Sequence, residues 1–294
     1  MSDVLKLCNV TKKYADFTLD NVSFTVPKGC ICGFIGQNGA GKTTTIQLIL
    51  DIIKKDGGSI EVMGQDMEKN GVALKENIGV VYDEMGFHEF MTPNEINTMM
   101  KNVYKNWQQE EFFEYLKRFS LPRNKKCGAF SRGMRMKLQI AVALSHKAEF
   151  LIMDEPTSGL DPIVRNEMLQ IFQEFVMDEN HTILLSSHIT GDLERIADMV
   201  VFIDHGKIVL SGNKDEILEN HGLIKCKKEE VAGIDPEDIV SVRKSGFGAE
   251  VLVFDKEKCS KKYTKLVMEN IGLEDIMIFY VNREMEKNND RTDL

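Results

Sequence analysis

The chain has no apolar stretch long enough to cross a membrane. A spanning helix needs roughly 18 predominantly apolar residues, whereas the longest apolar runs, such as Phe150–Met153 and Met199–Ile203, are far shorter. No positively charged segment followed by an apolar one stands at the N-terminus, so we expect no secretory leader. Any role at a membrane is therefore expected to depend on a partner chain.

The cysteines show no spacing typical of a disulfide framework. The six cysteines lie at positions 8, 30, 32, 127, 226 and 259, and none forms a Cys-x-x-Cys pair. Such spacing is typical of reduced thiols in the cytosol. Cys30 and Cys32 could suggest a metal or redox pair, but two such side chains on one strand are more often small core residues.

Basic residues are outnumbered by acidic ones. The 294 residues include 37 Lys and Arg against 46 Asp and Glu, a formal net charge of −9. Non-specific nucleic-acid binding needs many cationic side chains on one face, so we expect no nucleic-acid partner. A hydrophobic content of 43% and a charged content of 28% are ordinary for a globular protein. Only the tail, residues 286–294, is expected to be disordered.

A glycine-rich segment is the strongest functional signal that the chain does contain. It follows the apolar run Cys30–Ile35 and reads Gly36-Gln37-Asn38-Gly39-Ala40-Gly41-Lys42-Thr43-Thr44. Glycines let backbone N–H groups turn inward around a phosphate at the start of a helix. Lys42 then reaches the β- and γ-phosphates, and Thr43 offers its hydroxyl to Mg²⁺. The segment predicts a phosphate-binding loop; the alternative is a glycine-rich turn with a surface lysine.

The order of the apolar runs predicts an α/β fold with a parallel sheet. Phe150–Met153 and Thr182–Leu185 have the length and composition of buried parallel strands, and the helix between them begins with Asp161 as its N-cap. Alternating apolar residues before the phosphate loop indicate strands joined by turns, which form a β-subdomain. We expect a nucleotide-binding domain over residues 1–214, with a helical subdomain at about 88–149, and a small α+β domain over residues 215–285.

Two adjacent carboxylates close the first of those strands. Asp154 lies at the strand end, where it is placed to hold Mg²⁺. Glu155 can then orient and deprotonate an attacking water molecule. The alternative is an acidic strand end that only caps a neighbouring helix.

Three further segments make the pattern specific. They are Ser131-Arg132-Gly133-Met134 at a helix start, Pro156-Thr157-Ser158-Gly159-Leu160-Asp161 after the acidic strand, and Ser186-Ser187-His188 after the next strand. In this order the chain resembles the ATP-binding subunit of an ABC transporter over about residues 1–215. The resemblance implies the P-loop NTPase fold with its antiparallel β-subdomain, ATP and Mg²⁺ as cofactors, and ATP hydrolysis as the activity.

The resemblance also implies roles for individual residues. Two such domains are expected to pair head to tail, with each ATP between the phosphate loop of one chain and Ser131 and Gly133 of the other. His188 resembles the switch histidine that contacts the γ-phosphate. Asp161 matches a residue that reaches the opposite subunit, and Tyr14 matches the aromatic residue that stacks on adenine. Without the resemblance, His188 would be read as a core histidine and Tyr14 as an ordinary strand residue.

Two positions depart from the family pattern. The usual Leu-Ser-Gly-Gly-Gln is Phe130-Ser131-Arg132-Gly133-Met134 here, so Arg132 replaces a small residue. The position of a glutamine that coordinates the metal is held by Asp83, whose carboxylate still faces Mg²⁺ but reaches less far. Both departures are similar to exporters of the ABC-2 type, including the bacitracin-resistance and peptide-export groups, so export is favoured over import.

The implied partners are a separate transmembrane permease and a second ATP-binding subunit, at the cytoplasmic face of the cell membrane. The segment Phe87–Asn97 is expected to line the groove that receives the permease; alternatively these residues pack inside the helical subdomain. A different reading of the whole chain is a soluble ABC-type ATPase with no membrane partner.

Overall fold

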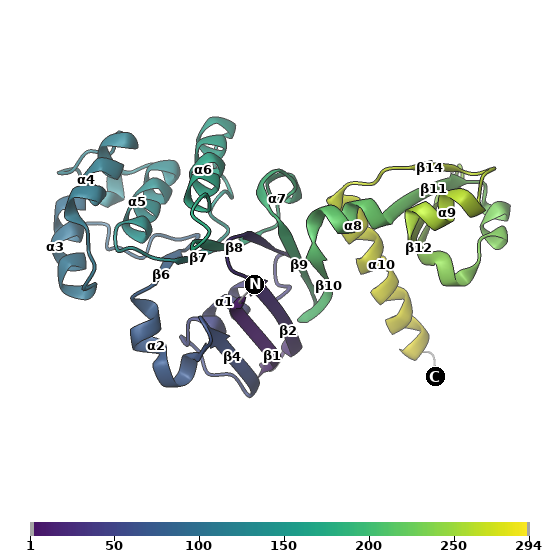
Figure 1. Ribbon diagram of the computed structural model, residues 1–294, viewed down its shortest axis with the longest axis horizontal. Coiled ribbons are helices and arrows are strands. Elements are labelled where there is room, and N and C mark those ends of the chain that lie inside the picture. Colours follow the sequence, from purple (N-terminus) through teal and green to yellow (C-terminus); the bar gives the residue numbers. More distant parts are fainter. Residues whose placement is uncertain (1–2, 293–294) are drawn as a thin grey trace. The chain divides into compact units, whose positions relative to one another are not determined.

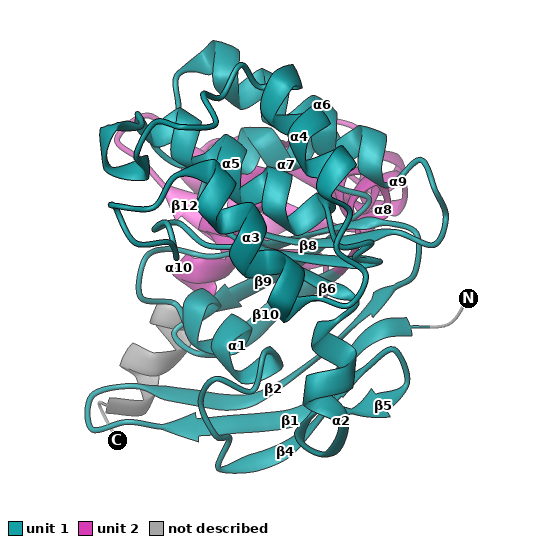
Figure 2. Cartoon of the chain, turned by 90° about the vertical axis from the view of Figure 1, so that its left-hand side faces the viewer, with its two compact units in different colours: residues 1–211 teal, residues 212–294 magenta. Residues whose placement is uncertain are grey.

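The computed structural model describes residues 3–292, with side chains as far as Arg283. The chain divides into two compact units, residues 1–211 and residues 212–294, which are coloured separately in Figure 2. The expected disordered tail, 286–294, lies outside the residues whose side chains are described. No described helix is both long enough and apolar enough to cross a membrane.

A six-stranded sheet forms the centre of the first unit (Figure 1). Its order is β10-β9-β3-β8-β7-β6, and the five strands from β9 to β6 run parallel to one another. The strands are β3 (Ile31–Ile35), β6 (Ile78–Val81), β7 (Phe150–Asp154), β8 (Thr182–Ser187), β9 (Met199–Asp204) and β10 (Lys207–Asn213). All residues of β3, β7 and β8 are buried, as the continuous apolar runs predict. Because parallel strands end at one edge of the sheet, the segments after Ile35, Asp154 and Ser187 come together.

A second sheet has the order β2-β1-β4-β5 and is antiparallel, which confirms the expected β-subdomain. Its strands are β1 (Asp3–Lys13), β2 (Thr18–Pro27), β4 (Gly57–Val62) and β5 (Gln65–Asp66). Val22, Phe24 and Val26 are buried on β2, and they join a core cluster that includes side chains of both sheets. This cluster packs the antiparallel sheet onto the region of the phosphate loop.

Helix α1 (Lys42–Ile49) follows the phosphate loop and is shorter than the sequence suggests. The apolar spacing of Ile46, Ile49 and Ile53 favours a helix that ends near Asp56. However, Asp51 has a φ of 51°, in the left-handed region, where a right-handed helix cannot continue. Ile53 still packs against the core cluster, so the apolar pattern marks burial beyond the helix end.

The remaining helices of the first unit lie on both sides of its central sheet. Figures 1 and 2 place α4, α5, α6 and α7 on one side, and α1 with the antiparallel sheet on the other. The helices are α2 (Met67–Lys75), α3 (Pro93–Val103), α4 (Gln109–Arg118), α5 (Arg132–Leu144), α6 (Pro162–Phe175) and α7 (Thr190–Ile196), with a 3₁₀ turn at Cys127–Ala129. Thr92 and Glu95 form a capping box that fixes the start of α3.

The second unit is built on a four-stranded antiparallel sheet of order β12-β13-β11-β14. Its elements are α8 (Lys214–Asn220), β11 (His221–Cys226), β12 (Ile239–Lys244), β13 (Ala249–Phe254), α9 (Lys256–Lys262), β14 (Val267–Glu269) and α10 (Leu273–Thr292). It has an apolar cluster of its own around Ile224, Val251 and Cys259. The spacing of Cys259, Tyr263, Leu266 and Val267 favours a single helix, but α9 ends at Lys262 because the chain turns at Tyr263. Val267 instead pairs with Lys225 in the sheet.

Candidate functional site

The phosphate loop joins the end of β3 to the start of α1, and three of its glycines are required by geometry. A Cβ atom on Gly36 would lie 2.5 Å from the backbone oxygen of Ile203. Gly39 and Gly41 have φ angles of 83° and 112°, which other residues rarely adopt. A Cβ on Gly41 would also lie 3.0 Å from the ring of Phe17, so the loop fits closely under the β1–β2 turn.

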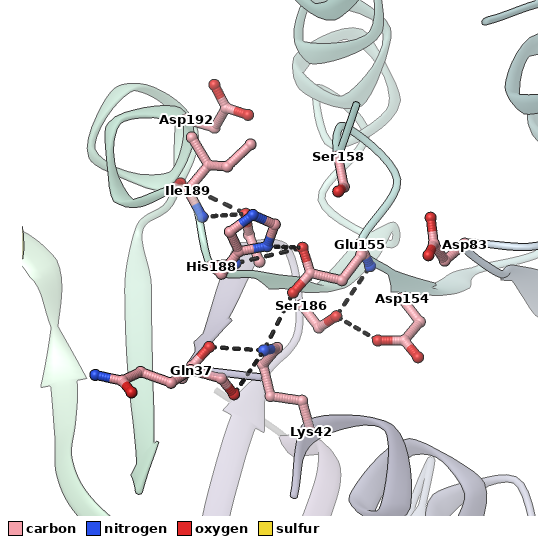
Figure 3. A network of polar contacts seen from close by, with 12 residues as sticks. Gln37, Lys42, Asp83, Asp154, Glu155, Ser158, Ser186, His188, Ile189 and Asp192 are labelled. Atoms are coloured by element: carbon pink, nitrogen blue, oxygen red, sulfur yellow. Dashed lines mark hydrogen bonds and ion pairs between the residues drawn. The ribbon is translucent and has the colours of Figure 1, made fainter. Parts of the chain in front are cut away.

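Lys42 is the first residue of α1, and its side chain is 6% exposed. Its ammonium donates hydrogen bonds to the backbone oxygens of Gly36, at 2.6 Å, and Gln37, at 3.2 Å. It also lies 3.1 Å from Glu155 Oε1 (Figure 3). A buried cation needs such partners, and the three oxygens fix the ammonium at the mouth of the loop.

Asp154 ends β7 and is 5% exposed. Thr43 Oγ1 donates to Asp154 Oδ2 at 2.7 Å, and Ser186 Oγ donates to Asp154 Oδ1 at 2.6 Å. A hydroxyl and a carboxylate held together in this way form a set of oxygen ligands that suits Mg²⁺. The donor set therefore fits the metal that the sequence implied for Thr43 and Asp154.

Glu155 connects the lysine to the histidine. Its Oε2 lies 2.6 Å from His188 Nδ1, and its backbone N–H donates to Ser186 Oγ at 3.0 Å (Figure 3). Glu155 has a φ of 52°, which is uncommon for a residue with a side chain. Its side chain is 14% exposed, whereas that of His188 is 42% exposed. The carboxylate is thus fixed between a buried cation and an imidazole that solvent reaches.

Ser186 is a residue that sequence reasoning did not assign to the site. It is fully buried on β8, and its hydroxyl both donates to Asp154 and accepts from the backbone of Glu155. One side chain thereby orients the two carboxylates that follow β7. The motif Ser186-Ser187-His188 contained it, but only the pairing of β7 with β8 shows what it contacts.

A second group of expected residues lies around a pocket of about 340 Å³, here called the signature pocket. Ser131 is the N-cap of α5 and accepts a hydrogen bond from the backbone of Met134 at 3.3 Å. Asp161 is the N-cap of α6, as expected, and accepts from Ile163 and Val164, both at 3.1 Å. The lining residues include Ser131, Arg132, Gly133, Gly159, Leu160, Asp161 and Val164.

The structure of the single chain does not join these two groups directly. Among the described residues, no hydrogen bond or ion pair links Ser131, Gly133 or Asp161 to the side chains around Lys42 and Glu155. The phosphate loop and the signature pocket are therefore separate surfaces of one chain.

Tyr14 and Asp83 are the remaining expected site residues. Tyr14 follows β1, is 47% exposed, and has the ammonium of Lys12 at 5.7 Å from its ring centre. Its backbone N–H donates to the backbone oxygen of Phe17, whose ring lies against Gly41 of the phosphate loop. Asp83 follows β6, and its carboxylate forms an ion pair with Arg132.

The similarity of this chain to known proteins covers the first unit and extends into the second. A model of the family described as ABC transporter matches residues 19–158. The bacitracin transport ATP-binding protein BcrA of Bacillus licheniformis is 38% identical over 71% of this chain and 69% of its own length. The linearmycin resistance ATP-binding protein LnrL of Bacillus subtilis is 31% identical over 86% of this chain and 83% of its own. A solved ATP-binding subunit of an ABC transporter, 27% identical, has a TM-score of 0.64 over 73% of this chain and 91% of its own.

Proposed function

Because this chain belongs to the ATP-binding proteins of ABC transporters and is an ATPase, we propose that it is the motor subunit of a membrane exporter. In this proposal two ATP-binding subunits close around MgATP and drive a separate permease, and hydrolysis reopens them. The observation that carries it is the contact of Glu155 with both Lys42 and His188, at 3.1 Å and 2.6 Å. These side chains converge at the edge of the sheet where the phosphate loop begins.

The contacts around Glu155 support a separate role in hydrolysis for each residue. Lys42 reaches the β- and γ-phosphates, since its ammonium already lies at the mouth of the loop. Glu155 accepts the proton of the attacking water, and His188, held by Glu155 Oε2, contacts the γ-phosphate and positions that water. Ser186 keeps both carboxylates in place through its hydrogen bonds.

Thr43 and Asp154 would hold the metal, because their oxygens already lie within hydrogen-bond distance of each other. Mg²⁺ supplies charge neutralisation of the phosphates when it is bound. We also propose Asp83 as a more distant carboxylate that faces the metal. Tyr14 stacks on adenine beside the loop.

The signature pocket would receive the ATP of the second subunit. Ser131 and Gly133 lie at the N-terminus of α5, where backbone N–H groups and the helix dipole favour an anion. A Cβ on Gly133 would lie 3.3 Å from Val164 Cγ1, so this position has little room for a larger residue. Asp161, at the start of α6, would reach the opposite subunit from the same pocket.

The permease would dock in a second pocket of about 560 Å³, here called the docking groove. It is lined by apolar and charged side chains: Asp83, Glu84, Met85, Phe87, Glu89, Phe130, Arg132, Arg135, Met136 and Gln139. Phe90, beside it in sequence, is 69% exposed, whereas Ile96 and Asn97 are buried on α3. The proposed docking surface is therefore limited to the first part of the segment Phe87–Asn97.

The relatives named for bacitracin transport and linearmycin resistance support export as the direction. A motor subunit of this kind would be peripheral on the cytoplasmic face of the cell membrane. No nucleic-acid partner is proposed.

The experiment that tests this function is the purification of a tagged Glu155→Gln chain from solubilised native membranes in MgATP. A membrane protein recovered in stoichiometric amount supports the motor-subunit role. As a matched control, the Glu149→Gln chain carries the same change at the other end of β7. Recovery of the Glu155→Gln chain only from the soluble fraction, without a membrane protein, would favour a soluble ABC-type ATPase.

A further inference from the structure

Arg132 is in an unfavourable place for a cation. It is the first residue of α5, and a positive charge at a helix N-terminus is repelled by the helix dipole. A residue that is unfavourable for its local structure, and does not stabilise the fold in another way, often lies at a functional position. The contacts of Arg132 show what it gains.

The guanidinium of Arg132 contacts two other segments. Its Nε donates to the backbone oxygen of Ser158 at 2.8 Å, and its Nη2 pairs with Asp83. A Cβ on Gly159 would lie 3.0 Å from Nε, so the side chain lies closely over that glycine. Arg132 thus joins the end of β6, the start of α5 and the loop before α6.

This ion pair contributes little to stability. The side chains of Arg132 and Asp83 are 48% and 47% exposed. Ion pairs as exposed as this contribute little to stability, because solvent screens them and both side chains lose conformational freedom. A phosphate group can accept two parallel, charge-assisted hydrogen bonds from a guanidinium, whereas Asp83 accepts one, from Nη2 to Oδ1. The pair with Asp83 is therefore easily exchanged for one with a phosphate.

Arg132 also lines both pockets. It belongs to the signature pocket, with Ser131, Gly133 and Asp161, and to the docking groove, with Asp83. Asp83 lines only the docking groove. A guanidinium that leaves Asp83 therefore remains within the pocket proposed to receive the second subunit's ATP.

We propose that Arg132 is a ligand of the γ-phosphate of the ATP bound by the second subunit, and that Asp83 competes with that phosphate for the guanidinium. This rests on the head-to-tail dimer of the proposed function. Arg132 favours closure of the dimer, and Asp83 opposes it. A group in the docking groove that binds Asp83 releases Arg132, which links occupation of the groove to closure.

The test compares variants of the two partners of the pair. The proposed role predicts that they shift the dimer dissociation constant in opposite directions, whereas a purely structural role predicts the same direction for both. In a Glu155→Gln background, the dimer dissociation constant is measured by sedimentation velocity in MgATP. We expect Arg132→Gln to raise it at least tenfold and Asp83→Asn to lower it several-fold. The double variant should behave like Arg132→Gln, because the opposition of Asp83 to closure acts through Arg132, whereas loss of a contact to Mg²⁺ would weaken the dimer whether or not Arg132 is present. If both single variants shift the constant in the same direction, the ion pair only stabilises the local structure and the proposal is wrong.

Two controls make the result specific. Arg118 forms a comparable surface pair with Glu174 at 2.7 Å, with side chains 44% and 40% exposed, and it lines neither pocket. Arg118→Gln should leave the dimer constant unchanged, and an equal effect there would reduce the role of Arg132 to net charge. Arg132→Lys keeps the charge but loses the planar guanidinium, so its dimer dissociation constant should lie between those of the chain with Arg132 and of Arg132→Gln. Thermal unfolding checks that each variant is folded.

The same experiment separates this inference from the proposed function. Absence of any dimer of the Glu155→Gln chain in MgATP overturns the head-to-tail dimer, and this inference with it. A dimer that forms but does not respond to Arg132→Gln overturns only the role of Arg132.

Discussion

At the scale of single residues, the site depends on side chains that each contact more than one neighbour. Glu155 contacts Lys42 and His188, and Ser186 contacts Asp154 and the backbone of Glu155. A substitution here removes a chemical group and also changes the position of the groups around it. The most informative variants are those that keep shape and change only charge or proton affinity.

Glu155→Gln is such a variant. We expect it to bind ATP, to lose turnover by about 10²- to 10⁴-fold because the base is gone, and to accumulate as a closed dimer. Steady-state phosphate release and nucleotide binding measure both effects. Glu149→Gln, at the other end of the strand, serves as the control. Turnover close to that of the unmodified chain would exclude Glu155 as the base.

The prediction for Tyr14 concerns the binding of ATP rather than its hydrolysis. Tyr14→Ala should weaken ATP binding by about 1–3 kcal/mol, the typical value of stacking between a base and an aromatic ring, and should slow hydrolysis at saturating ATP much less. Tyr14→Phe keeps the ring and should restore affinity. Equilibrium titration with a fluorescent ATP analogue measures the effect, and unchanged affinity in Tyr14→Ala would remove this residue from the site.

At the scale of helices and strands, sequence patterns predicted the first unit better than the second. The strands β3, β7 and β8 follow from continuous apolar runs, and the start of α6 follows from Asp161-Pro162. In the second unit the apolar run Met277–Val281 lies within α10. Five apolar residues suit a strand as well as a helix, so periodicity alone cannot decide between them.

Prediction of the candidate site from sequence is limited in a similar way. Lys42, Asp154, Glu155 and His188 could be named because each belongs to a motif that is contiguous in sequence. The ion pair of Arg132 with Asp83 and the hydrogen bonds of Ser186 could not, because each joins segments that are distant along the chain. Only the strand order and the packing of α5 bring them together.

His221 connects three elements of the second unit and leads to a prediction about pH. It is buried, its Nδ1 donates to the backbone oxygen of Ile217 at 2.7 Å, and its Nε2 lies 3.0 Å from the hydroxyl of Tyr280. Burial lowers the pKa of His221 below its ordinary value. As the pH falls, the unfolded chain therefore takes up this proton first, near its ordinary pKa of about 6.5.

It follows that the contribution of His221 to stability is complete above about pH 7 and is lost as the pH falls below about 6.5. NMR titration of the imidazole signals, assigned with a His221→Gln variant, should show His221 titrating below 6.5. The protection of the β11 amides against hydrogen exchange, after correction for the intrinsic exchange rate at each pH, should fall over the same range. Titration at or above pH 6.5 contradicts the prediction.

At the scale of the whole molecule, each unit has its own apolar core. The core of the first unit includes side chains from both of its sheets, and that of the second surrounds Ile224 and Val251. The phosphate loop, the signature pocket and the docking groove are all formed by residues of the first unit. The second unit contributes to none of these surfaces in the described part of the chain.

We therefore expect a chain of residues 1–213, which keeps β10 complete, to fold and to bind ATP within about threefold of the full-length affinity. Circular dichroism and nucleotide titration test this. A matched chain that ends after residue 204 lacks β10 and should be less stable, because β9 would then be an unpaired edge. Failure of the 1–213 chain to fold would show that the two cores depend on each other.

The left-handed backbone at Glu155 has an evolutionary consequence. Holding a residue other than glycine at a φ of 52° costs on the order of 1–3 kcal/mol. Glycine or asparagine adopts this conformation more readily. Under the proposed role of Glu155 as the base, selection for hydrolysis opposes that replacement. In a descendant chain released from that selection, we expect substitution by glycine or asparagine at position 155 while the fold persists.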